Sequence, residues 1–276
     1  MSSYTHGSGL DQPYTELRRW ISALRQQGRV IGALILRETR TRFGKSRLGY
    51  LWALAEPVVH VSLFAFLFSM LGRRPPVGDS EFLFLVTGFV PFFMFRDLGG
   101  HVMNAISANR ALLHYVVVKN VDVIAARIVL EIATKIVVFA ILLAGAGIYG
   151  LQWAPDRPML LVEGFLALAL LGAGLGTVNA VMSCALPIWA KLISWMNRIL
   201  YLTSGVMYSV EHIPEVGQKI LVWNPVMHGI TWIRMGFYQG FNSTLLDKSY
   251  IISWGLTLLV VGLLLERILR RKIERE

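Results

Sequence analysis

The sequence predicts an all-α integral membrane protein with six transmembrane helices, and three observations support that fold class. The chain is 55% hydrophobic and only 16% charged, with a mean hydropathy of +0.55, which is far from the balance of a soluble domain. Five or six apolar stretches are each long enough to cross a bilayer. The basic residues are also divided unevenly among the segments that join these stretches.

The distribution of Lys and Arg predicts the orientation. Of the 27 basic residues, 18 lie on one side of the predicted spans when Arg96 is counted there, six lie on the other side and three lie within spans. Because basic segments stay in the cytoplasm, both termini are expected to be cytoplasmic. A net charge of +10 also suits nucleic-acid binding, but this sidedness favours a membrane protein with no nucleic-acid partner.

Residues 1–49 form the predicted cytoplasmic N-terminal segment. Between residues 14 and 47, apolar side chains such as Leu17, Trp20 and Ile21 recur with basic residues opposite them. This pattern predicts an amphipathic helix on the membrane surface. The segment lacks the pattern of a cleavable signal peptide, so the first span is expected to direct insertion itself.

The six spans form the predicted transmembrane domain, residues 50–265. The first span, residues 50–71, has 22 residues and would extend about 33 Å, slightly more than the hydrocarbon core. The other five are predicted at residues 82–103, 121–149, 159–184, 188–208 and 250–265. A basic cytoplasmic tail, residues 266–276, follows the last span.

Two connections are longer than a simple loop requires. Residues 99–120 contain helix-forming residues and few charges, which predicts a short cytoplasmic helix that projects towards a cytosolic partner. Residues 209–249 are semi-apolar but are interrupted by Pro214, Gly217, Pro225 and Gly229. Their apolar portions are too short to cross a bilayer, so we expect a re-entrant extracytoplasmic hairpin before the last span.

No known catalytic or metal-binding motif occurs in the sequence. HExxH, CxxC and GxSxG are absent, and the single cysteine, Cys184, excludes a disulfide framework. The run Gly172, Gly174 and Gly176 lacks the lysine of a phosphate-binding loop, so we interpret Gly172 and Gly176 as a face for close helix contact. The chain is therefore predicted to be no enzyme and to bind no cofactor or metal, and any ATP and Mg²⁺ would be bound by a partner.

Three ionisable residues recur at every fourth position on one face of the third span: Arg127, Glu131 and Lys135. Opposite charges at this spacing can pair along a helix. A charge that faces lipid costs about 2.5–3.5 kcal/mol at the bilayer centre, so this charge ladder is expected to face protein or a cytosolic opening. Its function is either a clamp between helices or contact with a substrate.

The first span carries Glu56, His60, Phe64 and Phe68 at spacings that place the ring-bearing residues on one helical stripe. Aromatic faces can cover the apolar surface of a sugar ring while polar groups contact its hydroxyls. The candidate substrate pathway therefore consists of this stripe together with residues of the fifth span, namely Arg198, Tyr201 and Tyr208. Ordinary core contact around a proline kink is the alternative interpretation.

Two stretches resemble a known family. "RETRTRFGKSRLGYLWALAEP", residues 37–57, resembles the entry to the first span in permease subunits of type-2 ABC exporters that move surface polysaccharides. "NPVMHGITWIRMGFY", residues 224–238, is similar to the extracytoplasmic segment before the last span of the capsular polysaccharide export permeases. With the six-span plan, the resemblance extends over nearly the whole chain from about Leu17.

The resemblance implies a half-transporter. Two copies of the permease would form a homodimer with two cytosolic ATPase subunits, in the inner membrane of a Gram-negative bacterium. The ATPase would dock on the coupling segment, for which the candidate residues are His101, Asn104, Arg110 and His114. A basic patch at the cytoplasmic entrance would attract an acidic cargo or lipid headgroups, and it consists of Arg37, Arg40, Arg42, Lys45 and Arg47.

By the same resemblance, the cargo would be a lipid-linked capsular polysaccharide that is passed to periplasmic and outer-membrane export proteins. Charge and periodicity alone do not separate capsule from O-antigen or teichoic-acid cargo. An ion-coupled secondary transporter is a further alternative, because Glu56, Glu131 and Lys135 are ionisable residues within spans. The sequence shows no internal repeat of the kind found in many such transporters.

Overall fold

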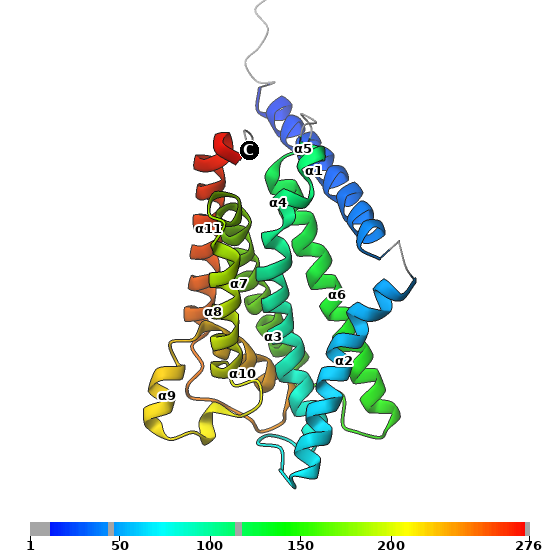
Figure 1. Ribbon diagram of the computed structural model, residues 1–276, viewed down its shortest axis with the longest axis vertical. Helices are drawn as coiled ribbons and strands as arrows, with labels where there is room; N and C mark the ends of the chain where they lie inside the picture. Colours follow the sequence, from blue (N-terminus) through cyan, green and yellow to red (C-terminus); the bar gives the residue numbers. More distant parts are fainter. Residues whose placement is uncertain (1–11, 44–46, 114–117, 274–276) are drawn as a thin grey trace, which may run out of the picture.

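The computed structural model describes residues 12–43, 47–113 and 118–273, and every regular element in these ranges is a helix. The helices are, in chain order, α1 (Gln12–Phe43), α2 (Arg47–Met70), α3 (Glu81–Met103), α4 (Ala105–Ala108), α5 (Arg110–Leu113), α6 (Asn120–Ile148), α7 (Pro158–Ala185), α8 (Trp189–Thr203), the 3₁₀ helix η1 (Val210–His212), α9 (Glu215–Leu221), α10 (Pro225–Phe237) and α11 (Lys248–Ile273). Figure 1 shows most of the long helices running along one direction, with α1 near one end and α9 and α10 near the other.

Helices lie at all six predicted spans, but only four of those in the described ranges are long and apolar enough to cross a membrane. These four are α3, α6, α7 and the Lys248–Arg270 part of α11. In α2 the side chains are described from Ala55 onward, and this part, Ala55–Met70, is apolar but too short by itself to count as a span, while α8 has 15 residues. The fold is therefore that of an all-helical membrane protein with four candidate spans, and the six-span plan stays a prediction.

Two helix boundaries differ from the predicted ones. The span predicted at residues 188–208 ends early, because α8 stops at Thr203 and Gly205 then has a φ of +71°, which favours glycine. The helix of the last span does not end at residue 265 but continues to Ile273, through most of the predicted tail. Lys and Arg are good helix formers, so a basic tail extends a helix without penalty.

The described part of the predicted coupling segment contains the end of α3 and two short helices. After α3 ends at Met103, Asn104 interrupts the helix, and α4 and α5 each contain four residues. The Asn109 amide donates a hydrogen bond to Ala105 O at 2.9 Å, which closes the turn between them. His114 lies outside the described residues. Residues 99–113 therefore begin inside α3 and leave it through a bend.

The segment predicted as a re-entrant hairpin contains η1, α9 and α10. Helix α10 begins where Asn224 accepts a hydrogen bond from Val226 N at 2.9 Å and Pro225 occupies the first helical position. Nearly all of α10 is buried, including Arg234, which is 2% exposed. A semi-apolar sequence here therefore reflects burial among helices, whereas the depth of the segment in a membrane stays a prediction.

Arg234 connects α10 to the end of α8. Its guanidinium donates hydrogen bonds to Gly205 O at 2.6 Å, Val206 O at 2.8 Å and Tyr208 O at 3.0 Å. Its Cζ atom also lies 3.9 Å from the centre of the Phe84 ring. Its Nη1 and Nη2 atoms are thus bound to backbone carbonyls, whereas its buried Nε has no hydrogen-bond partner among the described residues. Hydrogen bonds to the Nη atoms lower the cost of burying the charge and hold the chain that follows α8 in place.

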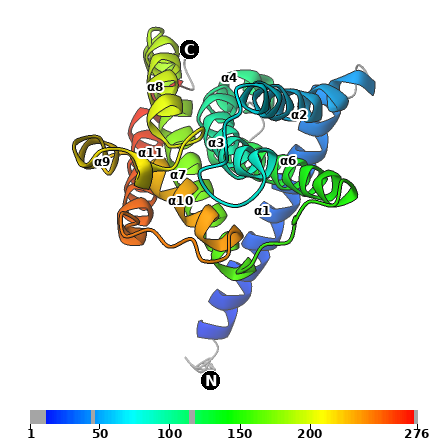
Figure 2. The same ribbon diagram turned by 90° about the horizontal axis from the view of Figure 1, so that it is seen from below.

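Helix α3 is the centre of the fold. It contacts α2, α6, α7 and α10, and its largest fully buried side chains are Phe84, Phe89, Phe92 and Phe93. Helix α1 contacts α6 and α2, and Figure 2 shows its N-terminal part extending beyond the outline of the other helices. Every residue placed on α3 is therefore held by several neighbouring helices.

The glycine face of α7 fits directly against α3, as predicted. A Cβ atom added at Gly172 would lie 2.8 Å from a Leu98 side-chain carbon, and one added at Gly176 would lie 2.4 Å from Leu98 O. Gly174 lies against α11, where an added Cβ would meet Gly255 O at 2.7 Å. Small residues allow this close backbone approach, which is typical of helix contacts in membranes.

Replacing Gly176 by Ala is expected to destabilise the protein by about 1–3 kcal/mol, because the new methyl group overlaps backbone that moves only with the whole of α3. Gly145→Ala in α6 is the matched control, since nothing lies within 4 Å of its added Cβ. The control should be neutral or slightly stabilising. Thermal denaturation of both variants in detergent measures the difference, and equal midpoints would contradict the close contact.

Candidate functional site

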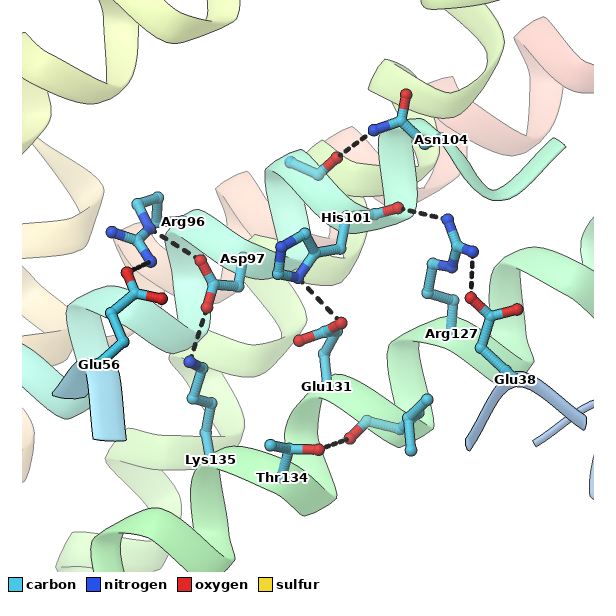
Figure 3. A network of polar contacts seen from close by, with 12 residues as sticks. Glu38, Glu56, Arg96, Asp97, His101, Asn104, Arg127, Glu131, Thr134 and Lys135 are labelled. Atoms are coloured by element: carbon cyan, nitrogen blue, oxygen red, sulfur yellow. Dashed lines mark hydrogen bonds and ion pairs between the residues drawn. The ribbon is translucent and has the colours of Figure 1, made fainter. Parts of the chain in front are cut away.

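A network of charged residues joins α1, α2, α3 and α6, and Figure 3 shows it from close by. Its central member is Asp97 of α3. Lys135 Nζ from α6 lies 2.6 Å from Asp97 Oδ2, and Arg96 Nε lies 2.7 Å from Asp97 Oδ1. The side chains of Asp97 and Lys135 are only 7% and 6% exposed. Both oxygens of this buried carboxylate are therefore bound by cations.

The same network continues towards the end of the molecule where α1 lies. His101 Nδ1 of α3 is 3.0 Å from Glu131 Oε1 of α6. Arg127 donates a hydrogen bond to His101 O at 2.9 Å and forms an ion pair with Glu38 of α1. These contacts connect α1, α3 and α6 through one ion pair, Arg127 with Glu38, and through the hydrogen bonds that His101 makes with Arg127 and Glu131.

Two further contacts hold α1 in place. Gln27 donates a hydrogen bond to Asp122 Oδ1 of α6 at 2.6 Å. Arg37 donates one at 2.6 Å to Asn109 Oδ1, in the turn between α4 and α5. The second half of α1 is therefore linked by side chains to α6 and to the bend that follows α3.

The predicted charge ladder faces protein, as expected. Arg127 contacts α1 and α3, whereas Glu131 and Lys135 both contact α3. The spacing of these residues thus brings three charges of α6 to the side covered by other helices. The contacts support a clamp between helices more directly than pairing along α6 alone.

On the other side of Asp97, the network reaches an accessible surface. Arg96 Nη2 lies 3.1 Å from Glu56 Oε1 of α2, and these side chains are 32% and 52% exposed. The Arg96 Cζ atom lies 4.5 Å from the centre of the Phe93 ring, one turn earlier in α3. Arg96 therefore lies between a buried carboxylate, an exposed carboxylate and an aromatic face.

An aromatic cluster continues from this ion pair along α2, α3 and α8. The His60 ring is 4.7 Å from Phe89 and 5.1 Å from Phe93 between ring centres. His60 Nε2 and Tyr201 Oη are 3.1 Å apart, and Phe64 lies 5.0 Å from His60. Such tilted and edge-on contacts are the favoured arrangements of aromatic rings.

The candidate pathway is brought together only in part. Glu56, His60, Phe64 and Tyr201 belong to the ion pair and the cluster, and Phe68 follows Phe64 at 5.9 Å between ring centres. Arg198 is exposed, with its Cζ atom 5.6 Å from the Trp195 ring. Tyr208 donates a hydrogen bond to Leu202 O at 2.9 Å, beyond the end of α8. No described contact joins these last two to the cluster.

Sequence reasoning missed several members of the site, among them Glu38, Phe89, Phe93, Arg96 and Asp97. The charge count places Arg96 with the cytoplasmic loops, whereas it lies within α3. The available signal was the adjacent pair Arg96 and Asp97 inside the predicted span 82–103, because charges within a span mark functional positions or buried ion pairs. The phenylalanines gave no separate signal, since α3 is rich in this residue.

The predicted cytoplasmic residues are distributed over several elements. Arg37 contacts Asn109, Arg40 is exposed on α1, and Arg110 is exposed at the start of α5. His101 belongs to the charge network, while Asn104 donates to Gly100 O at 3.4 Å. The remaining predicted members have no described side chains, and these are Arg42, Lys45, Arg47 and His114.

Asp97, His101 and Glu131 offer three possible metal-ligand atoms within 4.8 Å of one another. Their surroundings suit a cation poorly. Both Asp97 oxygens are within 2.7 Å of Lys135 and Arg96 nitrogens, and Glu131 is bound to His101. A metal ion would have to displace these partners and lie beside their positive charges, so the group is better described as part of the ion-pair network.

Comparison with known proteins shows the family to which the chain is similar in sequence. Residues 29–238 match the family model described as ABC-2 type transporter. The chain belongs to that family. The matched residues extend from α1 to the end of α10, so they include the whole charge network and the aromatic cluster.

Three relatives of this ABC-2 transporter have informative names. It is 33% identical to the polysialic acid transport protein KpsM of Escherichia coli, over 86% of this chain and 92% of the relative. It is 28% identical to the capsule polysaccharide export inner-membrane protein CtrC of Neisseria meningitidis, over 88% of this chain and 92% of the relative. It is 21% identical to the O-antigen export system permease protein RfbA of Klebsiella pneumoniae, over 82% of this chain and 86% of the relative.

In this ABC-2 transporter, Asp97→Asn is expected to destabilise the fold by about 3–5 kcal/mol, because the buried Lys135 and the partly buried Arg96 lose the carboxylate that neutralises them. Glu163→Gln is the control, since Glu163 Oε2 pairs with Lys248 Nζ at 3.5 Å and both side chains are well exposed. The control is expected to change stability by about 0–1 kcal/mol. Thermal denaturation in detergent distinguishes them, and similar midpoints would argue against Asp97 as the central ion.

Proposed function

We propose that the chain is the membrane permease of an ATP-driven exporter that moves a lipid-linked capsular polysaccharide from the cytoplasm to the periplasm. The similarity to KpsM and CtrC over most of both chains carries this proposal. The sequence has no nucleotide-binding motif, so ATP and Mg²⁺ would be bound by a separate ATPase subunit. The permease itself is then a transport subunit and not an enzyme.

The proposed topology has six membrane crossings with both termini in the cytoplasm. Four crossings correspond to the candidate spans, and α2 and α8 supply the other two. The excess of Lys and Arg on the side of the termini supports this orientation. CtrC is named as an inner-membrane protein, which agrees with a multi-pass protein of the bacterial inner membrane.

The proposed assembly contains two permeases and two cytosolic ATPase subunits, followed by periplasmic and outer-membrane export proteins. The ATPase would dock on the segment formed by α4, α5 and the adjoining part of α1. The Arg37–Asn109 hydrogen bond supports a single docking surface, because it joins α1 to the bend between α4 and α5. The Glu38–Arg127 ion pair would transmit a displacement of α1 to α6 and α3.

The proposed polysaccharide route follows the Glu56–Arg96 ion pair and the aromatic cluster. An exposed charged pair inside the helical bundle is unfavourable against lipid, so a water-filled or cargo-filled space beside it is the better surrounding. Rings such as His60, Phe64 and Tyr201 offer flat apolar faces with polar edges beside that space. Sugar rings present the same combination of apolar faces and hydroxyls.

O-antigen export is the second candidate cargo class, and it is supported by the match to RfbA. That match has lower identity than those to KpsM and CtrC, which favours capsule. An ion-coupled secondary transporter is disfavoured, because membership of the ABC-2 type transporter family implies an ATPase partner.

Deletion of the gene in the source organism is expected to remove the polymer from the cell surface and to leave it inside the cell, because the permease forms the route across the membrane. A plasmid copy should restore export. Polysaccharide is measured in surface and intracellular fractions, and co-purification tests for the ATPase. Normal surface polymer in the deletion strain would refute the function, and transport by the isolated permease without ATP would favour the secondary transporter.

Arg110→Glu is expected to lower the amount of ATPase that co-purifies with the permease by roughly tenfold, because reversing a charge in a docking surface places like charges together. Lys219→Glu is the matched control, since Lys219 is also exposed but belongs to α9, near the other end of the molecule. Equal recovery of ATPase with both variants would show that α5 is not part of the docking surface.

A further inference from the structure

Arg96 has two carboxylate partners, and they differ in how firmly they are held. Asp97 is 7% exposed, and its second oxygen is bound by Lys135 at 2.6 Å. Glu56 is 52% exposed, and its contact with Arg96 is a single hydrogen bond of 3.1 Å. Asp97 is therefore a fixed partner, whereas the exposed Glu56 side chain can turn away from Arg96.

Arg96 loses the partner of its Nη2 atom when Glu56 leaves. Its Nε atom stays bound to Asp97, whose other oxygen is already bound by Lys135. The Nη2 donors then lie without their carboxylate in a candidate span, where a charged group needs a partner. A negatively charged group from outside the chain can take that place, and a guanidinium is the side chain best suited to receive a carboxylate or phosphate.

The surroundings suit an acidic sugar. The Phe93 ring lies against Arg96, and His60 follows Glu56 by one turn of α2 and contacts Phe93 at 5.1 Å between ring centres. Phe93 is buried, so it supports the Arg96 guanidinium, whereas a sugar whose acidic group reaches Arg96 would lie near the partly exposed ring of His60. In Figure 3, Glu56 and Lys135 reach the Arg96–Asp97 pair from different helices, so the Glu56 position can change while Lys135 stays.

We propose that Arg96 is an anion-exchange site for the cargo. An acidic group of the polymer, a carboxylate or a phosphate, replaces the Glu56 carboxylate at the Arg96 guanidinium, and Glu56 returns to release it. Exchange between two anions avoids an unpaired charge at any stage, so acidic units pass the site without being trapped. This inference rests on the proposed export function and adds the chemical class that the route selects.

The test measures binding to the purified complex of permease and ATPase in lipid nanodiscs. The probes are a short oligomer of sialic acid, inorganic phosphate, and a neutral dextran oligomer of similar length. Glu56→Gln is expected to tighten binding of an acidic probe by about tenfold, because the competing carboxylate is lost while its shape is kept. Arg96→Gln should abolish that binding and Arg96→Lys should retain part of it, while dextran binding stays the same in every variant.

Glu163→Gln is the matched control, because it makes the same chemical change in an exposed ion pair of another helix. It should leave the affinity for every probe unchanged. A gain in Glu56→Gln for the sialic acid oligomer supports exchange with sugar carboxylates, and a gain for phosphate alone supports exchange with a phosphate at the lipid terminus. An unchanged or weaker affinity for both acidic probes in Glu56→Gln would overturn the proposal, even if Arg96→Gln fails to fold.

The outcome can be separated from that of the export function. If the unaltered permease restores surface polymer in the deletion strain but Glu56→Gln binds acidic probes no more tightly, only the exchange site is refuted. If the unaltered permease restores no polymer, the export function itself is refuted.

Discussion

The ion pair between Asp97 and Lys135 is the interaction on which the arrangement of α3 depends. A buried carboxylate inside a membrane protein is stable only with its charge neutralised, and Lys135 from α6 lies at 2.6 Å. This contact sets the position of α3 along α6, so that His101 meets Glu131 and Arg127 reaches His101 O. Asp97 also binds the Nε atom of Arg96, while the Nη2 atom of Arg96 binds Glu56. One oxygen of Asp97 therefore binds the buried Lys135, and the other binds Arg96, which is partly exposed.

Close contacts at glycines hold α3 in addition to the ion pairs. Gly172 and Gly176 let α7 approach α3 until an added Cβ would overlap Leu98, and Gly174 does the same for α11 on another side of α7. Helix α3 is consequently held by ion pairs from α6 and by close backbone contact with α7. Because both kinds of contact are intolerant of sliding, the phenylalanines of α3 keep a fixed position relative to α6 and α7, and it is to this surface that His60 and Tyr201 bring their rings.

Much of the helical plan could be predicted from the sequence, because apolar length is a direct physical requirement of a bilayer. The charge ladder and the glycine face were also predictable, since helical spacing alone places Arg127 near Glu131 and Gly172 near Gly176. The partners of these residues could not be predicted. Asp97 and Glu38 meet α6 only through the register between helices, which no local pattern encodes. The early end of α8 was missed because the stretch beyond Thr203 is apolar through burial under α10.

The two ends of the molecule are held by groups with different chemistry. At the α10 end, the Arg234 guanidinium binds the carbonyl oxygens of Gly205, Val206 and Tyr208, which cannot gain or lose a proton. At the α1 end, side chains of different helices bind one another, Arg127 with Glu38 and His101 with Glu131. The contact at the α10 end therefore needs only one particular side chain, because every residue supplies a carbonyl oxygen. The contacts at the α1 end need a matching residue on both helices, so a single substitution on either helix is enough to remove one of them.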